Sequence, residues 1–546
     1  MNSQTPPKPA WITILALGLI TPAFAERWSG DHHAADAPPD MSGHARKTEM
    51  DLSLFGPEPD YGDQTYDPEV ERLLYTKWDV PQSDPIVELG RRQYRAGSFE
   101  RSSDVFGATN LTFGGVDSYF LGHDLKWFEE HEGKTVGGIP QTLIYGDFRL
   151  GTAYNDTGVT EKAVIATRLN LDVDIRFTAS ERIHAFFTPL NDGGNATRWE
   201  FAGGDNTNDE AVFNLEPSSL FFEGDLARMM DGWSGGEYMT DADLPISFGL
   251  MPLFMQNGTW VFDAFTGFAI TPWTAKNSQA LDITNMDTTL FFGFDRVSTA
   301  AIPDDSDVNI YGITSYIEAR ESYIELGYGY VQGQNQFDDL SYHNLTAALT
   351  RRYFGKISNS VRAIWNVGQN PDPGRAKTAD GLFLSVENSL ITSNYHGFVP
   401  YLNLFAGFGT PQSLARDPGV GGVLFNTGIL FESDNLTGYP TLNGTANNTY
   451  GFAVGLNMLS GLDFEATALD RTSYMDQGDH ANTKQLVAEL AAVFSDNPAI
   501  PDQYGLGLRY QRAISNSWLF RADAMYGIVV DSPNISGIRC EIRRKF

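Results

Sequence analysis

Cysteine is almost absent from this sequence of 546 residues, in which Cys540 is the single one. One thiol excludes an intramolecular disulfide, a four-cysteine zinc site and a c-type haem attached through two cysteines. We therefore expect no bound cofactor, and any redox centre would have to belong to a partner.

Long hydrophobic runs are also missing. The most apolar stretch, residues 12 to 20, has nine residues, whereas a membrane-spanning helix needs about 20. With Lys8 before it and a small-x-small site at Ala23 to Ala25 after it, the stretch predicts a signal peptide over residues 1 to 25. An uncleaved anchor is the alternative. A mature chain without apolar helices can cross a membrane only as a closed barrel, and a soluble periplasmic protein is the competing interpretation.

Basic residues are scarce, because 38 Lys and Arg stand against 69 Asp and Glu, for a formal net charge of -31. Such a charge repels nucleic acid, which we exclude as a partner. Acidic loops are the simplest interpretation. On a Gram-negative surface they could share divalent cations with lipopolysaccharide phosphates, although a solvated acidic exterior explains the charge equally well.

Glycine and aromatic residues are abundant, with 54 glycines and 13% aromatics at a mean hydropathy of -0.27. This composition is too polar for a helical membrane protein and suits a barrel whose strands alternate between two faces. Residues 26 to 105 do not alternate and are rich in Pro, Asp, Glu and His. We expect them to form a periplasmic or plug-like segment, partly disordered, before a barrel over residues 106 to 546.

The clearest strand pattern runs from residue 168 to 177, where apolar and polar side chains alternate without a break. Residues two apart share one face of a strand, so one face is apolar and the other is charged. After a turn at 178 to 181 the chain returns, which predicts a hairpin with a short connection. The polar face, expected to line a pore, consists of Arg168, Asn170, Asp172, Asp174 and Arg176.

Short turns and long polar connections follow one another along the rest of the chain. Short turns on one rim and long loops on the other are typical of bacterial outer-membrane barrels. We predict an all-β, transmembrane antiparallel barrel of about 18 strands, within a range of roughly 16 to 20. Aromatic residues near segment ends, among them Trp365 and Tyr401, are candidates for interfacial girdles. Short turns are expected within 317–325, 353–361, 458–464 and 511–518, and long connections over 191–215, 332–341, 368–379, 409–420, 433–447 and 471–483.

The last strand resembles the terminal strand of Gram-negative porins. Counting back from Phe546, apolar side chains such as Ile538 and Ile542 share the outward face, while charged ones face the lumen. The resemblance implies that Phe546 is read by the barrel-assembly machinery. Arg544 departs from the pattern, since porins carry an aromatic or apolar residue there, but an arginine near the interface can extend to the headgroups.

A second stretch, from Ile246 to Phe265, resembles a strand-and-loop motif of the alginate-export and phosphate-selective porin families. Phe248-Gly249 and Asn257-Gly258 carry this resemblance, although the families have an arginine where this chain has Leu250. The resemblance implies a barrel and passive transport, and it indicates no particular solute.

Strand parity places further charged side chains on the pore wall. Arginines from the last three strands, which are neighbours, could form a cationic ladder that attracts anions. Alternatively, Asp523 and Glu541 neutralise these arginines through internal salt bridges. The predicted pore-lining residues are Arg168, Asp172, Asp174, Arg176, Arg509, Arg521, Asp523, Arg539, Glu541 and Arg543.

Enzymatic and metal-binding motifs are poor. Residues 232 to 236 match G-x-S-x-G, but they lie in a Gly-rich loop and not at the strand-to-helix elbow that this chemistry needs. Asp305 and Asp307 imitate the start of a calcium loop, yet Ile310 replaces its glycine. We expect no catalytic and no metal-binding residues.

These patterns predict an outer-membrane channel for the passive diffusion of small polar or charged solutes, without enzymatic turnover. Its partners would be the outer membrane, lipopolysaccharide, the barrel-assembly machinery and the solutes, and a homo-oligomer is an open alternative. Other functions consistent with the sequence are an export or conduit barrel, for a polysaccharide or a partner electron-transfer protein, and a surface enzyme or adhesin.

Overall fold

The computed structural model describes residues 141–546, apart from 177–180, 193–194, 203–209, 228, 231–243, 279–282, 393–397, 418–420, 434–435, 461–483 and 515–517. The expected signal peptide, the segment 26–105, the start of the expected barrel at 106–140 and the G-x-S-x-G match therefore lie outside the described residues. In the part of the chain that is described, no helix is long and apolar enough to cross a membrane.

Antiparallel strands account for most of the described residues. A transmembrane strand needs about 9 to 11 residues, and the five strands from β10 to β14 have 11 or 12 each. The strands are β1 (Gln141–Asp156), β2 (Glu161–Arg176), β3 (Arg182–Phe187), β4 (Asn191–Asp192), β5 (Asn195–Ala202), β6 (Pro217–Asp225), β7 (Pro245–Met255), β8 (Val261–Ser278), β9 (Ile283–Asp295), β10 (Val308–Ala319), β11 (Ser322–Gly333), β12 (Tyr342–Tyr353), β13 (Ile357–Val367), β14 (Asp380–Leu390), β15 (Phe398–Thr410), β16 (Ala415–Arg416), β17 (Thr449–Ser460), β18 (Lys484–Ser495), β19 (Gln503–Ala513), β20 (Trp518–Val529) and β21 (Ile535–Lys545).

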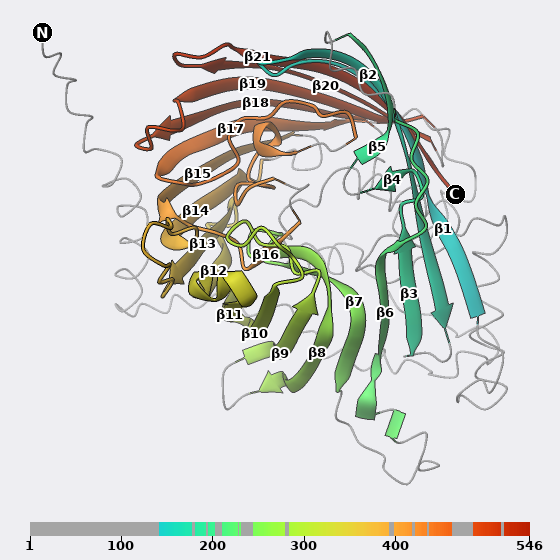
Figure 1. The fold of residues 1–546 in the computed structure, drawn as a ribbon, viewed down its shortest axis with the longest axis vertical. Coiled ribbons are helices and arrows are strands. Elements are labelled where there is room, and N and C mark those ends of the chain that lie inside the picture. The colour runs from blue at the N-terminus through green and yellow to red at the C-terminus, as the bar shows by residue number, and fades with distance from the viewer. Residues whose placement is uncertain are drawn as a thin grey trace, which may run out of the picture. The chain divides into compact units, whose positions relative to one another are not determined.

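The wall strands close into a barrel. Each pairs antiparallel with the next, and β1 pairs with β21 over Asp147 to Asp156. The backbone N–H and C=O of Phe546 both bond to Gly146 at 3.0 Å, which extends this seam. Of the 21 strands, β4, β5 and β16 are additional, and the other 18 form the wall. Figure 1 shows the strands following one another around a ring in chain order. The predicted fold class and strand number are confirmed.

The two faces of the wall differ in chemistry. On β19, Arg509 and Gln511 point inward and are buried, while Leu506 and Leu508 point outward and are 48% and 45% exposed. Hydrophobic side chains so exposed, around a charged interior, invert the pattern of a soluble protein and are typical of a barrel in lipid.

We call residues 411–448, which connect β15 and β17, the lumen connection, and its described residues lie inside the barrel. We expected two separate long connections here, over 409–420 and 433–447, whereas both belong to this one connection. Within it, β16 pairs in parallel with β8, inside the ring of Figure 1, and the 3-10 helix η5 (Ile429–Phe431) packs against β18 and β19. A Cβ on Gly407 would lie 1.7 Å from the carbonyl oxygen of Ala446, so glycine is required where the lumen connection meets the wall.

The rims are arranged largely as expected. The turns 320–321 and 354–356 are short, and the connection 368–379 on the opposite rim is long. The prediction of a short turn within 458–464 is wrong, because β17 continues to Ser460, which pairs with Lys484 of β18. The connection 461–483 therefore leaves from the rim of short turns, where we had not expected a long loop, and its residues lie outside the described ones.

Side chains from the wall and from the lumen connection form an apolar core inside the barrel. Trp260 is fully buried and donates its indole N–H to Asn344 Oδ1 at 2.9 Å, and Leu414 and Leu430 belong to the same core. Tyr401, expected in a girdle, points inward and donates its hydroxyl to Glu489. The interior is therefore partly filled, and any solute path runs beside this core.

Candidate functional site

Inward-facing charged side chains gather on the side of the barrel formed by β1, β2, β3 and β19 to β21. The predicted pore-lining residues lie on the inward face of these strands, except that the side chain of Arg176 lies outside the described residues. They fall into three groups. The groups are the Asp523 cluster (Arg509, Arg521, Asp523, Arg539 and Glu432), the Arg168 row (Arg168, Arg149, Arg543, Asp147 and Glu541) and the His184 group (Tyr145, Asp172, Asp174, Arg182 and His184).

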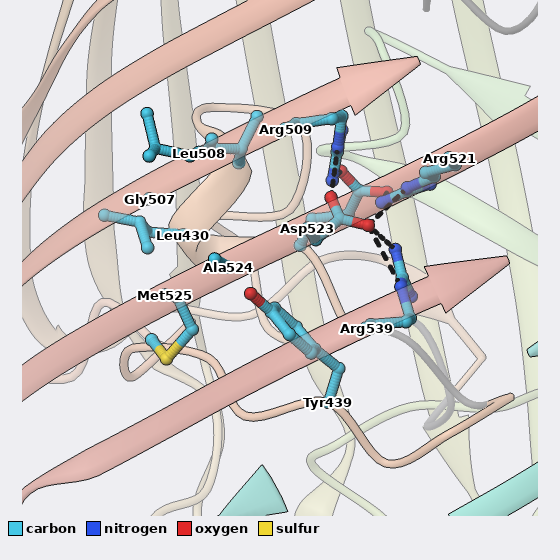
Figure 2. Close-up of a pocket in the computed structure, with 12 residues that line it drawn as sticks. Leu430, Tyr439, Gly507, Leu508, Arg509, Arg521, Asp523, Ala524, Met525 and Arg539 are labelled. Atoms are coloured by element: carbon cyan, nitrogen blue, oxygen red, sulfur yellow. Dashed lines mark hydrogen bonds and ion pairs between the residues drawn. The ribbon is translucent and has the colours of Figure 1, made fainter. Parts of the chain in front are cut away.

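The Asp523 cluster gathers three guanidiniums around one carboxylate (Figure 2). Strand register places Arg509 and Arg539 on either side of Asp523. Asp523 accepts from Arg509 Nε at 2.8 Å, from Arg521 Nε at 2.7 Å and from Arg539 Nη2 at 2.6 Å. Glu432, from the lumen connection, lies 2.6 Å from Arg509 and 3.6 Å from Arg521. The internal salt bridges that were the alternative to a bare ladder are therefore present.

The lumen connection covers the Asp523 cluster. Arg539 is 1% exposed and Asp523 6%, and the ring of Tyr439 lies over the Arg539 guanidinium at 5.2 Å. The space left between these side chains is about 10 Å³, which holds at most one water. These arginines therefore bind the connection to the wall and leave no room for a solute.

Glu432 is held in its charged form by this arrangement. Burial alone would raise the pKa of its carboxyl, but Arg509 and Arg521 outweigh burial and lower the pKa to about 2. The connection thus carries a permanent negative charge into the cationic side of the wall, which explains why it lies there.

A second carboxylate anchors the same connection. Glu489, buried on β18, accepts the backbone N–H of Leu430 at 2.8 Å and that of Ile429 at 3.0 Å, at the start of η5. Asn155 on β1 donates to the carbonyl of Thr437 at 2.8 Å. Together with the pairing of β16 with β8, these bonds attach the connection to both sides of the described wall.

The Arg168 row lies below this attachment, toward the rim of short turns. Register places Arg168 directly opposite Arg149, and Arg149 opposite Arg543. Glu541 accepts from Nε and Nη2 of Arg149, both at 2.7 Å, and Asp147 lies 3.2 Å from Arg543 Nε. Three guanidiniums thus share two carboxylates, and like charges placed opposite each other repel. Counted over these five residues, the row carries one surplus positive charge, and Asp417 of the lumen connection also acts electrostatically on Arg168.

Arg168 carries that surplus. Its Nε donates to Asn170 Oδ1 on the same strand at 3.0 Å, and no carboxylate among the described residues forms an ion pair with it. A guanidinium has five N–H donors, and the Arg168 side chain is only partly buried. Arg168 can therefore donate to an anion that enters the barrel.

The His184 group neutralises the two remaining candidates. His184 lies between them, with Nδ1 at 2.8 Å from Asp174 and Nε2 at 3.3 Å from Asp172. Asp174 also accepts the Tyr145 hydroxyl at 3.0 Å. In the part of the chain that the structure describes, no group of His, Cys, Asp or Glu has the arrangement of a metal site.

Sequence reasoning missed Arg149, Glu432 and Glu489. Arg149 could have been found, because residues 147 to 150 alternate as 168 to 177 do. Glu432 and Glu489 could not, because their roles depend on the path of the lumen connection, which no local pattern reveals.

No protein-family model matches the sequence, and no curated protein matches it either. Among solved structures, OprD of Pseudomonas aeruginosa is 10% identical, with 76% of this chain and 95% of that chain covered and a TM-score of 0.46. OccK2 (OpdF) of the same organism is 10% identical, with 74% and 98% covered and a TM-score of 0.47. Wzi of Escherichia coli, a carbohydrate-binding β-barrel involved in capsule assembly, is 11% identical, with 73% and 84% covered and a TM-score of 0.39. The fold assignment rests on the strand pairing and not on these similarities.

Proposed function

We propose that this chain is an outer-membrane channel for the passive diffusion of small polar or charged solutes, with a preference for anions. The observation that carries the proposal is a closed barrel, apolar outside and charged inside, in which Arg168 has no carboxylate partner among the described residues. Transport involves no chemical turnover, because selection by lumen width and lumen charge is sufficient.

The path of the solute follows from which parts of the inner wall the lumen connection covers. The lumen connection contacts β8 through β16, β18 through Glu489 and the upper part of β1 through Asn155, whereas the Arg168 row lies beside its edge. A small anion passing that edge meets a guanidinium with free donors, and carboxylate or phosphate oxygens match its geometry.

The location belongs to the same proposal. Residues 1 to 25 would direct export and be removed, and Phe546, whose backbone completes the β1–β21 seam, would be read by the assembly machinery. Deleting Phe546 should therefore lower the yield of heat-modifiable barrel in outer-membrane fractions. Unchanged yield would contradict this role.

Planar bilayers test the channel itself. The purified barrel should produce stepwise conductance increments as single molecules insert. A barrel that inserts and never conducts would overturn the diffusion channel and favour a closed conduit for a polysaccharide or a partner protein.

The anion preference is tested by Arg168→Gln. At low salt, one unit charge about 8 Å from an ion in water favours an anion by about 0.5 kcal/mol and disfavours a cation by as much, so the anion-to-cation permeability ratio should fall roughly 5-fold. Arg544→Gln is the matched control, because it removes the same charge from the outward face, where Arg544 lies over Trp518 at 5.6 Å. Equal effects of both variants would contradict a specific role for Arg168.

A further inference from the structure

The outer face of the wall carries an apolar groove that plays no part in the lumen. It crosses β10 to β14 and has a volume of about 670 Å³. Its lining includes Ser315, Leu326, Tyr328, Ala347, Ala363 and Trp365. Leu326, Tyr328 and Trp365 are 45%, 40% and 51% exposed, which places this lining on the outward face.

Small side chains on β10, β12 and β13 form most of the floor of the groove, with Leu326 of β11 between them. Ser315 pairs with Leu326, Leu326 with Ala347, and Ala347 with Ala363, so these positions follow one line across neighbouring strands. The Ser315 hydroxyl is bonded to Thr288 at 2.9 Å, so its polar group is satisfied within the wall. Elsewhere, on β18 to β21, small outward side chains such as Ala488 and Ala522 are accompanied by large exposed ones such as Leu490 and Ile538. The groove therefore exists because its floor lacks bulk.

The direction of the groove favours a thin, flexible occupant. Five strands at about 4.8 Å spacing give a length of about 19 Å across the strands. Strands in such barrels tilt by about 35–45°, so the groove runs obliquely to the barrel axis. The convex wall of a second barrel would meet the exposed Tyr328 and Trp365 first and leave the floor empty, whereas an acyl chain can follow the line between them.

One end of the groove lies at the level where lipid headgroups begin. Trp365 lies near the end of β13 and Leu345 near the start of β12, both at the rim of long connections. Above them, the Tyr328 hydroxyl and His343 Nδ1 are 2.9 Å apart, and the Tyr330 ring lies 5.0 Å from the His343 ring. Aromatic rings with polar tips are typical of the membrane interface.

We propose that this groove binds one acyl chain of an outer-leaflet lipopolysaccharide molecule, with Tyr328 and His343 beside its polar end. The proposal rests on the outer-membrane location given above, and it is independent of whether the barrel conducts. A depression in a lipid-facing wall must be filled, because a void forfeits the packing contacts on both sides. The long-loop rim is the one opposite Phe546, so the leaflet that meets it is the outer one.

The experiment fills the floor of the groove and measures the lipid that remains bound. The double variant Ala347→Leu and Ala363→Leu is purified from outer membranes in mild detergent, and lipopolysaccharide per barrel is counted by native mass spectrometry. Wild type should retain one copy through detergent washing, and the double variant should lose it. The control is Ala488→Leu with Ala522→Leu, which adds the same bulk to outward positions on β18 and β20 and should retain the lipid.

Each other outcome counts against the proposal. Equal retention by the double variant and wild type overturns it. Retention of phospholipid in place of lipopolysaccharide overturns the assigned source, and loss of an oligomer in the double variant identifies a second copy as the occupant.

Heat-modifiable mobility shows whether the double variant folds. If it does not, Trp365→Ala, which removes an exposed side chain, should lower retention several-fold, and no loss in that variant also overturns the proposal. Conductance of the same samples tests the channel separately.

Discussion

Two groups of arginines lie on the same side of the barrel and differ in what faces them. In the Asp523 cluster, three guanidiniums converge on one carboxylate and are covered by the lumen connection. In the Arg168 row, the side chains of Arg149 and Arg543 are 13% and 15% exposed, and Arg168 has no carboxylate partner among the described residues. Charge on the inner wall is therefore not the same as charge in the pore.

The difference assigns separate roles. Buried charges that neutralise one another hold the lumen connection in place, whereas a partly exposed surplus charge acts on passing ions. Removing the shared carboxylate tests the role of the first group, and measuring ion selectivity tests the role of the second.

The largest effect is expected from Asp523→Asn. Removing one partner of a buried ion pair costs about 3–5 kcal/mol, because Arg509, Arg521 and Arg539 would lose the carboxylate on which all three converge. Unfolding of the vesicle-inserted barrel by urea measures the loss. Arg168→Gln, at a partly exposed site, should change stability by less than about 0.5 kcal/mol. Similar losses of unfolding free energy in both variants would mean that the Asp523 cluster and the Arg168 row contribute equally to stability.

A smaller effect is expected from Gly407→Ala. The new methyl group would meet the carbonyl oxygen of Ala446, so the lumen connection must shift, at a cost of about 1–3 kcal/mol. Conductance should rise as the connection moves from the wall. In Gly444→Ala, within the same connection, the nearest atom would be 3.2 Å away, and conductance should stay close to wild type. A rise in both variants would contradict a fixed connection.

The path of the lumen connection marks the limit of what the sequence predicts. Alternation placed Arg509 and Asp523 on the inward face correctly, because strand parity is a local property. It did not reveal that residues 421 to 432, between the two expected connections, belong to the lumen connection. Leu430 there packs against Gly505 and Gly507 of the wall, and such a contact depends on residues far away in the chain. Whether an inward arginine is covered depends on the same distant contacts.

Selectivity gives a smaller and more specific test. Parity alone predicts that Arg539 sets ion selectivity, since it faces inward. The structure predicts the opposite, because Arg539 is 1% exposed and bonded to Asp523. The reversal potential of Arg539→Gln under a salt gradient should therefore match wild type, while Arg168→Gln shifts it. Because surface charges are screened within about 8 Å at physiological salt, the Arg168→Gln shift should fade as salt rises. A shift in Arg539→Gln would show that the Asp523 cluster is open to the pore.

The pH dependence of stability distinguishes a covered Glu432 from a solvated one. Its pKa is lowered from the ordinary 4.5 to about 2 by Arg509 and Arg521, against the opposing effect of burial. A carboxyl with a lowered pKa contributes stability above its unfolded pKa, and this contribution is lost as pH falls toward the folded pKa. The unfolding free energy of wild type relative to Glu432→Gln should therefore be constant above about pH 4.5 and decrease between about pH 4.5 and 2. If the difference were instead independent of pH down to about pH 2, Glu432 would titrate as it does in the unfolded chain, and the lumen connection would not lie against the arginines.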